Sequence, residues 1–173
     1  YTDIISKSPF ETHEFLKGKD VSIVQYAAFF GASQIFNHIW SSDNFDASKA
    51  IDSLWVYALL GGNPEILEKL HEFGQGALNP DIVKECTIAL IHHHGDLSIL
   101  ENYGNDIWGN QEEPQQEGPR AFYLHPYLSA ALESHNFSFL LENFDQIKNS
   151  KAPLDLVMQE FFVNACKADL YEI

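Results

Sequence analysis

The sequence contains little cysteine and few positive charges. Cys86 and Cys166 are its only cysteines, and both lie among apolar neighbours, so we expect two buried free thiols in a reducing compartment. Only 10 Lys and Arg residues stand against 25 Asp and Glu residues, and the resulting net charge of −15 repels phosphate backbones and anionic membrane surfaces. This argues against a nucleic-acid partner. It is compatible with a protein partner whose surface is basic or apolar, and equally with an acidic exterior that has no special role.

A secretory signal and a long hydrophobic run are also missing. The 22 residues from 21 to 42 carry no formal charge, but they include polar side chains such as Gln25, Asn37 and His38. These side chains favour a buried helix pair over a membrane span, and we expect no membrane insertion. We also expect an intracellular, cytoplasmic protein, although a chain that begins at Tyr1 rather than Met can have lost a signal.

The common catalytic and metal-binding motifs are absent. Residues 12–17 begin like a zinc-protease motif, but Lys17 stands where the second histidine is required. Residues 43–52 lack the central glycine of a calcium loop, and neither a Gly-x-Ser-x-Gly motif nor a Gly-x-x-x-x-Gly-Lys phosphate loop occurs. Residues 136–138 match a glycosylation acceptor, but we expect Asn136 to cap a helix instead. The sequence thus predicts no catalytic activity, no cofactor and no small-molecule substrate.

A short pattern recurs along the chain with a nearly constant step. The steps between successive anchor residues are 31, 33, 40 and 34. The long step coincides with a polar insertion containing Gly and Pro at residues 104–120, which we expect to be a mobile loop. Each anchor is followed after four residues by a turn residue and after eight by an apolar residue: Ala27, Gly31 and Ile35; Ala58, Gly62 and Ile66; Ile91, Gly95 and Ile99; and, with substitutions, Ala131, His135 and Phe139, and Ala165, Asp169 and Ile173.

Each recurring unit has the pattern of two helices joined by a turn. In the first helix apolar residues stand three and four apart, as in Leu54, Ala58 and Leu59. The second helix is expected to begin at a residue that caps free backbone N–H groups, which contributes about 1 kcal/mol. The array predicted for residues 20–173 is therefore all-α. The expected caps are Ser33, Asn63, Asp96 and Asn136.

Residues 1–19 are expected to add a capping helix in front of this array. Ser8, Pro9 and Glu11 fit a capping box at its start. Gly18 fits the residue after its end, where a left-handed backbone conformation is common.

The stretches AAFFGASQI (27–35) and ALLGGNPEI (58–66) resemble the central part of ankyrin repeats. The resemblance covers about residues 20–173. It implies a helix-turn-helix repeat solenoid that binds other proteins through a concave face, without cofactor or catalysis. The chain departs from the family where Thr-Pro-Leu-His usually starts a repeat, because residues 22–25 read Ser-Ile-Val-Gln, and no Gly-containing β-hairpin signal separates the units. We therefore expect an ankyrin-like array with reduced or absent fingers, or a related helical-hairpin solenoid.

Three consecutive histidines at residues 92–94 are the strongest candidate for chemistry. They stand at the expected end of a helix, before Gly95, where a residue with positive φ turns the chain and imidazoles meet free carbonyl groups. Successive helical residues point about 100° apart, so three adjacent imidazoles cannot converge on one ion. We expect a turn and no metal. The metal alternative would combine Cys86 and His93 with His125 or His135.

In the resembled family, the residues around the paired alanines tend to face the concave surface. In this chain those positions form an aromatic and apolar stripe, which we expect to be the partner-binding surface: Tyr26, Phe29, Phe30, Tyr57 and Leu60. The alternative is that neighbouring helices or the N-terminal helix bury this stripe as core. Trp108 in the insertion is a further contact candidate, and its alternative is a hydrophobic pin that holds the loop against the array.

The sequence therefore predicts a non-catalytic protein–protein interaction module whose apolar face has an acidic rim. Two other functions stay open. The chain can be a structural subunit of a larger assembly, with its apolar faces covered by fixed neighbours. The other open function is an enzyme with a histidine-based site.

Overall fold

The computed structural model of the chain describes residues 4–5, 11–74, 78–103 and 121–143, together with the single helical positions 159 and 163. This part of the protein is mostly helical, which confirms the predicted helical class. The chain divides into two compact units, residues 1–82 and residues 83–173.

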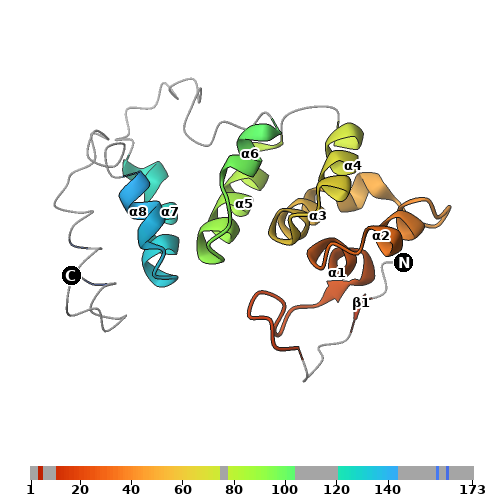
Figure 1. The fold of residues 1–173 in the computed structure, drawn as a ribbon, viewed down its shortest axis with the longest axis horizontal. Coiled ribbons are helices and arrows are strands. Elements are labelled where there is room, and N and C mark those ends of the chain that lie inside the picture. Colours follow the sequence, from red (N-terminus) through yellow and green to blue (C-terminus); the bar gives the residue numbers. More distant parts are fainter. Residues whose placement is uncertain are drawn as a thin grey trace. The chain divides into compact units, whose positions relative to one another are not determined.

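Two helical hairpins build the first unit (Figure 1). Helices α1 (Ile23–Phe29) and α2 (Ser33–Trp40) form one hairpin, and α3 (Ala47–Gly61) and α4 (Pro64–Gly74) form the other. Helix α1 packs against both α2 and α3, and α3 packs against α4. Burying one large apolar side chain contributes about 1.5–3 kcal/mol, so this interior dominates the stability of the unit. Its fully buried side chains include Ala28, Phe36, Leu54, Trp55, Ala58, Ile66 and Leu70.

Glycines with positive φ turn the chain inside both hairpins, as predicted. Gly31 and Gly62 each have a φ of 63°, a left-handed conformation that glycine adopts without steric cost. Beside Gly31, the Ala32 amide donates to the carbonyl oxygen of Ala27 at 2.8 Å, and Gly62 itself donates to Ala58 at 2.9 Å. These bonds satisfy helix carbonyls that the end of a helix would otherwise leave free.

The second helix of a hairpin begins at a capping side chain in only some of the predicted places. Asn63 accepts from the Ile66 amide at 3.3 Å, and Asn136 accepts from the Phe139 amide at 3.1 Å, so both predicted caps are confirmed. Ser33 is not a cap, because α2 begins at Ser33 itself and Ala32 precedes it without a side-chain bond. Asp96 lies one residue too early, although its carboxylate accepts from Ser98 N at 2.9 Å.

The N-terminal helix expected for residues 1–19 is not formed in its described part from residue 11 onward, which forms a turn. The amides of Leu16 and Lys17 donate to the His13 carbonyl oxygen, at 3.0 and 2.9 Å, and the chain then reverses at Gly18 with a φ of 75°. A positive φ at this point ends any helical path after one turn. Residues 6–10, including Ser8 and Pro9, lie outside the described residues.

A short antiparallel strand pair takes the place of that helix. Strand β1 (Ile4–Ile5) pairs with β2 (Val21–Ser22), with Ile4 opposite Ser22. A capping box occurs at the start of α1: Ser22 caps this helix by accepting from the Gln25 amide, and the Gln25 side chain accepts from the Ser22 amide at 2.9 Å.

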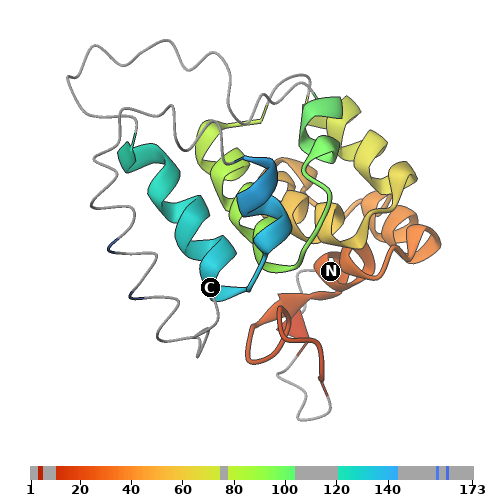
Figure 2. The ribbon, with the colours of Figure 1, turned by 60° about the vertical axis from the view of Figure 1, so that its left-hand side comes forward.

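Helix α5 (Pro80–His92) begins in the first unit and continues into the second. Three helices follow it in the second unit: α6 (Ser98–Asn102), α7 (Ala121–Glu133) and α8 (Phe137–Glu142). Figure 2 shows α7 and α8 as a hairpin. An apolar cluster joins this hairpin to α5 and consists of the buried residues Ile91, Ala130, Ala131 and Phe139. The predicted insertion at 104–120 and the predicted fifth unit lie outside the described residues, apart from positions 159 and 163.

Candidate protein-binding face

Five of the predicted contact residues lie together on α1 and α3. We call Tyr26, Phe29, Phe30, Tyr57 and Leu60 the aromatic face. Phe29 is buried, with 8% of its surface exposed, and Tyr26, Tyr57 and Leu60 pack against it half-buried. The Phe30 ring lies 5.1 Å from the Phe29 ring and 4.8 Å from the Tyr26 ring, centroid to centroid. The spacing of these residues along two adjacent helices produces this cluster, because residues three or four apart share a helix face.

The aromatic face is neither entirely core nor entirely surface. Phe29 is core, whereas Phe30, at the end of α1, keeps 54% of its surface exposed. An aromatic residue with this exposure, joined to a packed apolar cluster, is typical of the anchor of a protein interface. The sixth predicted contact residue, Trp108, lies outside the described residues.

A segment of the chain itself covers the centre of the aromatic face. The Phe15 ring stacks on Phe29 at 5.7 Å with an angle of 10° between the ring planes, and it meets the edge of Tyr57 at 5.3 Å. His13 approaches Phe29 edge-on at 4.6 Å, and Leu16 is 3% exposed in the same cluster. We call residues 11–20 the N-terminal segment. The alternative in which N-terminal residues cover the stripe is thus present in part, as a turn instead of a helix.

One polar contact fixes the edge of this cover. The Tyr26 hydroxyl donates a hydrogen bond to the Glu11 carboxylate. This bond lowers the pKa of Glu11 from its ordinary value of 4.5 and raises the pKa of Tyr26 from 10.0. Lys19 adds a cation–π contact, with its ammonium nitrogen 3.5 Å from the centre of the Phe15 ring.

The packing of Phe15 and Leu16 on the aromatic face was not predicted from the sequence. Residues 12–17 were predicted to belong to the capping helix and they begin like a zinc-protease motif, but within them Phe15 and Leu16 stand as an isolated apolar pair among polar and charged neighbours. Such a pair is the available signal for a segment that docks on an apolar surface. What it docks on depends on tertiary structure.

The three histidines occupy the end of α5, and the left-handed residue there is His94, with a φ of 54°, not Gly95. Gly95 is needed for a different reason, since a Cβ at this position would lie 2.5 Å from Cδ2 of Leu90. The His94 ring nitrogen Nε2 lies 3.0 Å from the Ser134 carbonyl oxygen, and His92 lies 3.8 Å from the Glu133 carboxylate. These contacts give His92 and His94 structural roles within the second unit.

The part of the chain that the structure describes contains no group of three or more His, Cys, Asp or Glu side chains placed to hold a metal ion. Cys86 is buried, and the loss of hydration raises the pKa of its thiol to about 12. A protonated thiol is a poor metal ligand and a poor nucleophile.

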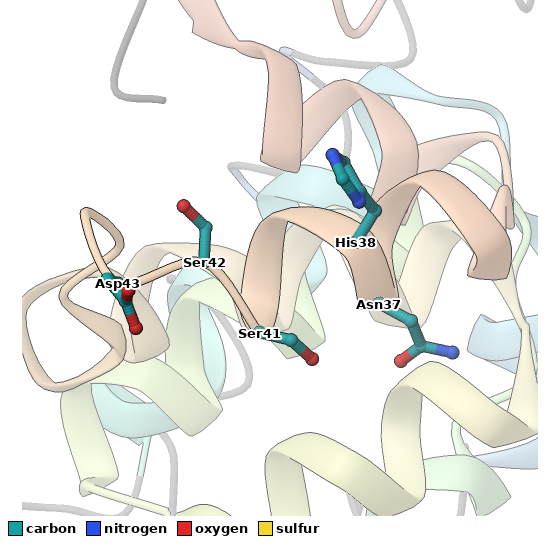
Figure 3. Close-up of a pocket in the computed structure, with 5 residues that line it drawn as sticks. All are labelled: Asn37, His38, Ser41, Ser42 and Asp43. Atoms are coloured by element: carbon teal, nitrogen blue, oxygen red, sulfur yellow. The ribbon is translucent and has the colours of Figure 1, made fainter.

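A depression on the surface of the first unit is lined by Asn37, His38, Ser41, Ser42 and Asp43. Figure 3 shows that these side chains point in different directions and do not converge on a common point. The Asn37 amide is already engaged with α4, donating to Glu65 at 2.6 Å and accepting from Lys69. The arrangement therefore lacks the convergent polar groups of a small-molecule site.

A second aromatic group surrounds Trp40 at the end of α2. Its ring lies 5.4 Å from Phe36, 5.6 Å from Phe45 and 5.3 Å from Phe73. Phe36 is buried, and Phe73 on α4 is 45% exposed. These rings pack on the Trp40 ring, which stabilises the first unit.

No known family model matches the chain, and neither the curated proteins nor the solved structures contain a significant match. Within the described ranges, no helix combines the length and the apolar character that crossing a membrane requires.

Proposed function

We propose that the chain is a non-catalytic protein–protein interaction module that binds a partner protein through the aromatic face. The observation that carries this proposal is the half-exposed Phe30 ring, which continues a packed cluster of aromatic side chains contributed by two helices. Interfaces gain most of their affinity from a few aromatic anchors surrounded by packed neighbours, and this face offers such an anchor. The acidic composition favours a partner with a basic or apolar surface.

An ankyrin-like repeat solenoid with reduced fingers is the architecture that we propose for this module. Support comes from the recurrence of one local geometry: the first helix of each described hairpin ends at a residue with a left-handed backbone, at Gly31, Gly62, His94 and His135. Repeats of this kind present the same face of successive first helices along one side, where partners bind. An intracellular location is part of the proposal and is supported by the scarcity of cysteine.

A photo-cross-linking amino acid at position 30 tests this function. The full-length chain with the cross-linker at Phe30 is expressed in the source cell, and a second chain carries it at Phe73, which is similarly exposed but belongs to the Trp40 group. We expect a discrete cross-linked partner from position 30 that position 73 does not give. The partner, identified by mass spectrometry, is then purified and its affinity measured by calorimetry.

Point variants decide whether the aromatic face provides that affinity. Phe30→Ser is expected to weaken binding by about tenfold or more, because truncating an interface anchor costs at least about 1–2 kcal/mol. Phe73→Ser should leave the affinity unchanged. Equal affinities for wild type and Phe30→Ser would refute the proposal. A chain that aggregates unless its neighbours are co-expressed would instead support the structural subunit of an assembly.

A further inference from the structure

We infer that the N-terminal segment occupies the aromatic face as an internal stand-in for the partner, which therefore presents a short turn carrying an aromatic residue followed by an aliphatic residue. The inference rests on the proposed function and adds to it the chemistry of the ligand and a mechanism of self-competition. Its central observation is that the chain already places such a turn, Phe15 and Leu16, on the residues proposed to bind the partner.

Two apolar side chains of the N-terminal segment enter the apolar cluster, and the His13 ring contacts Phe29 at its edge. Leu16 is buried and Phe15 is half-buried, whereas residues 12–14 and 17–20 are exposed. The buried part of the contact between the segment and the face therefore comes from one aromatic and one aliphatic group, and the exposed His13 ring adds an edge contact to Phe29. A partner peptide that replaces the segment needs the same aromatic and aliphatic groups. Phe15 and Leu16 shape the space that the peptide would fill.

The turn supplies its own backbone hydrogen bonds. His13 accepts from the amides of Leu16 and Lys17, and Leu16 accepts from the amide of Lys19 at 3.1 Å. The Glu11 carboxylate also accepts from the His13 amide at 2.8 Å. A segment with internal bonds of this kind can leave the surface without first breaking helix α1 or α3, as locally opening elements do.

The polar contact adds a specificity element to the apolar pair. Glu11 stands four residues before Phe15, and its carboxylate accepts from the Tyr26 hydroxyl. A partner of matching chemistry carries an acidic residue about one turn before its aromatic residue, so that Tyr26 keeps an acceptor after the exchange. The ligand class is thus an acidic residue, three intervening residues, and an aromatic–aliphatic pair.

Self-competition lowers the apparent affinity of the module, because only the fraction of molecules with an open face can bind. A labelled synthetic peptide with the sequence of residues 11–20 tests this directly, without any knowledge of the natural partner. We measure its binding by fluorescence anisotropy to the full-length wild type and to the full-length Phe15→Ser, Leu16→Ser double variant, whose own segment has lost both anchors.

The double variant is expected to bind the peptide with saturation and at least about tenfold more tightly than the wild type. A peptide with serine at both anchor positions should not bind either chain. The single Phe15→Ser variant serves if the double variant does not fold. The inference is overturned if the variants bind the peptide no better than the wild type does.

Hydrogen exchange of the unmodified wild-type chain gives a second test. The amides of Leu16, Lys17 and Lys19 are expected to exchange at least about tenfold faster than the amide of Leu59 in α3, because the segment opens while the helices stay folded. Equal protection would show that the segment is a fixed part of the fold, which overturns the inference. The proposed function would survive that result as long as the Phe30 variants still weaken binding of the purified partner.

Discussion

The side chain of Asn63 connects the turn at Gly31 to the helix that Asn63 itself caps. Its amide nitrogen Nδ2 donates to the carbonyl oxygen of Gly31 at 2.9 Å, while its oxygen Oδ1 accepts from the Ile66 amide at 3.3 Å. One residue therefore bonds a turn carbonyl in the first hairpin, which also accepts from the Ser33 amide at 2.9 Å, and a free N–H group at the start of the second helix of the other hairpin. The bond fixes the distance between the two turns within this unit.

Asn136 has the same double role in the second unit. Its Nδ2 donates to the Ile91 carbonyl oxygen at 2.9 Å, and its Oδ1 accepts from the Phe139 amide at 3.1 Å. With only 6% of its surface exposed, it cannot also carry a glycan, which explains why the glycosylation match at residues 136–138 is accidental.

Replacing Asn136 with Ala should lower the free energy of unfolding by about 2–3 kcal/mol, measured by urea denaturation. Loss of the cap accounts for about 1 kcal/mol, and the rest comes from loss of the buried bond to the Ile91 carbonyl oxygen, which keeps only the longer bonds from the His94 amide and the Ser134 hydroxyl, both at 3.3 Å. Asn63→Ala should cost less, about 1–2 kcal/mol, because Asn63 is only half-buried and water can replace its bonds. Asn136→Ser keeps a cap oxygen but lacks the amide group that donates to the Ile91 carbonyl oxygen, and it should fall between wild type and Asn136→Ala. Equal stability of wild type, Asn136→Ala and Asn136→Ser would contradict this role of Asn136.

Two adjacent glycines at the end of α3 should respond differently to substitution by alanine. A Cβ at Gly61 would lie 2.3 Å from the Ala28 carbonyl oxygen and 2.7 Å from that of Phe29. Both carbonyl groups belong to the backbone of α1. Gly61→Ala must push α1 and α3 apart, and we expect a loss of about 3 kcal/mol or more. Thermal unfolding followed by circular dichroism measures the loss.

Gly62→Ala is the matched control for Gly61→Ala. A Cβ at Gly62 has open space around it, so the substitution costs only the left-handed backbone strain at a φ of 63°, about 1–2 kcal/mol. The close helix contact would be disproved by a Gly61→Ala chain that is as stable as the Gly62→Ala chain.

The features predicted correctly from sequence are those that depend on a few neighbouring residues. The turns at Gly31 and Gly62 and the caps at Asn63 and Asn136 follow from local backbone chemistry. The same reasoning misplaced the left-handed residue of α5 by one position, because the contact between Gly95 and Leu90 is not visible in the periodicity.

The aromatic face was predictable as a set of residues but not as a covered surface. Helical spacing brings Tyr26, Phe29 and Phe30 to one side of α1. Whether such a stripe is open or occupied depends on tertiary contacts, here those of Phe15 and Leu16, which come from a segment that was expected to be helical. Local propensity cannot decide between a capping helix and a turn that docks by two side chains.

The substitution His135→Gly should stabilise the chain. His135 has a φ of 57°, which costs a residue with a side chain about 1–2 kcal/mol, and its side chain is exposed. Part of this gain is offset because glycine has more freedom in the unfolded chain, so we expect a net increase of about 0.5–1 kcal/mol in urea denaturation. His94→Gly should gain less, because it also removes the contact to the Ser134 carbonyl oxygen. An equal gain at both positions would show that the His94 contact contributes nothing.

Attachment of the N-terminal segment should depend on pH through the Glu11–Tyr26 hydrogen bond. The bond lowers the pKa of Glu11 below 4.5, so its contribution is complete above pH 4.5 and is lost as the pH falls through the lowered value. It raises the pKa of Tyr26 above 10.0, so the contribution is also complete below pH 10 and is lost as the pH rises through the raised value. Between these limits, attachment of the segment should not change on account of this bond.

An NMR titration of the Glu11 carboxyl carbon in the full-length chain measures this effect. In Tyr26→Phe the donor is gone, and the Glu11 pKa should return towards 4.5, because the tyrosine hydroxyl is the largest cause of the lowered value. Tyr57→Phe, which leaves the Tyr26 hydroxyl in place, should keep the Glu11 pKa low. If the two variants titrate alike, the Tyr26 hydroxyl does not hold the Glu11 carboxylate in solution, and the acidic residue should then be removed from the predicted ligand class while the aromatic–aliphatic pair remains.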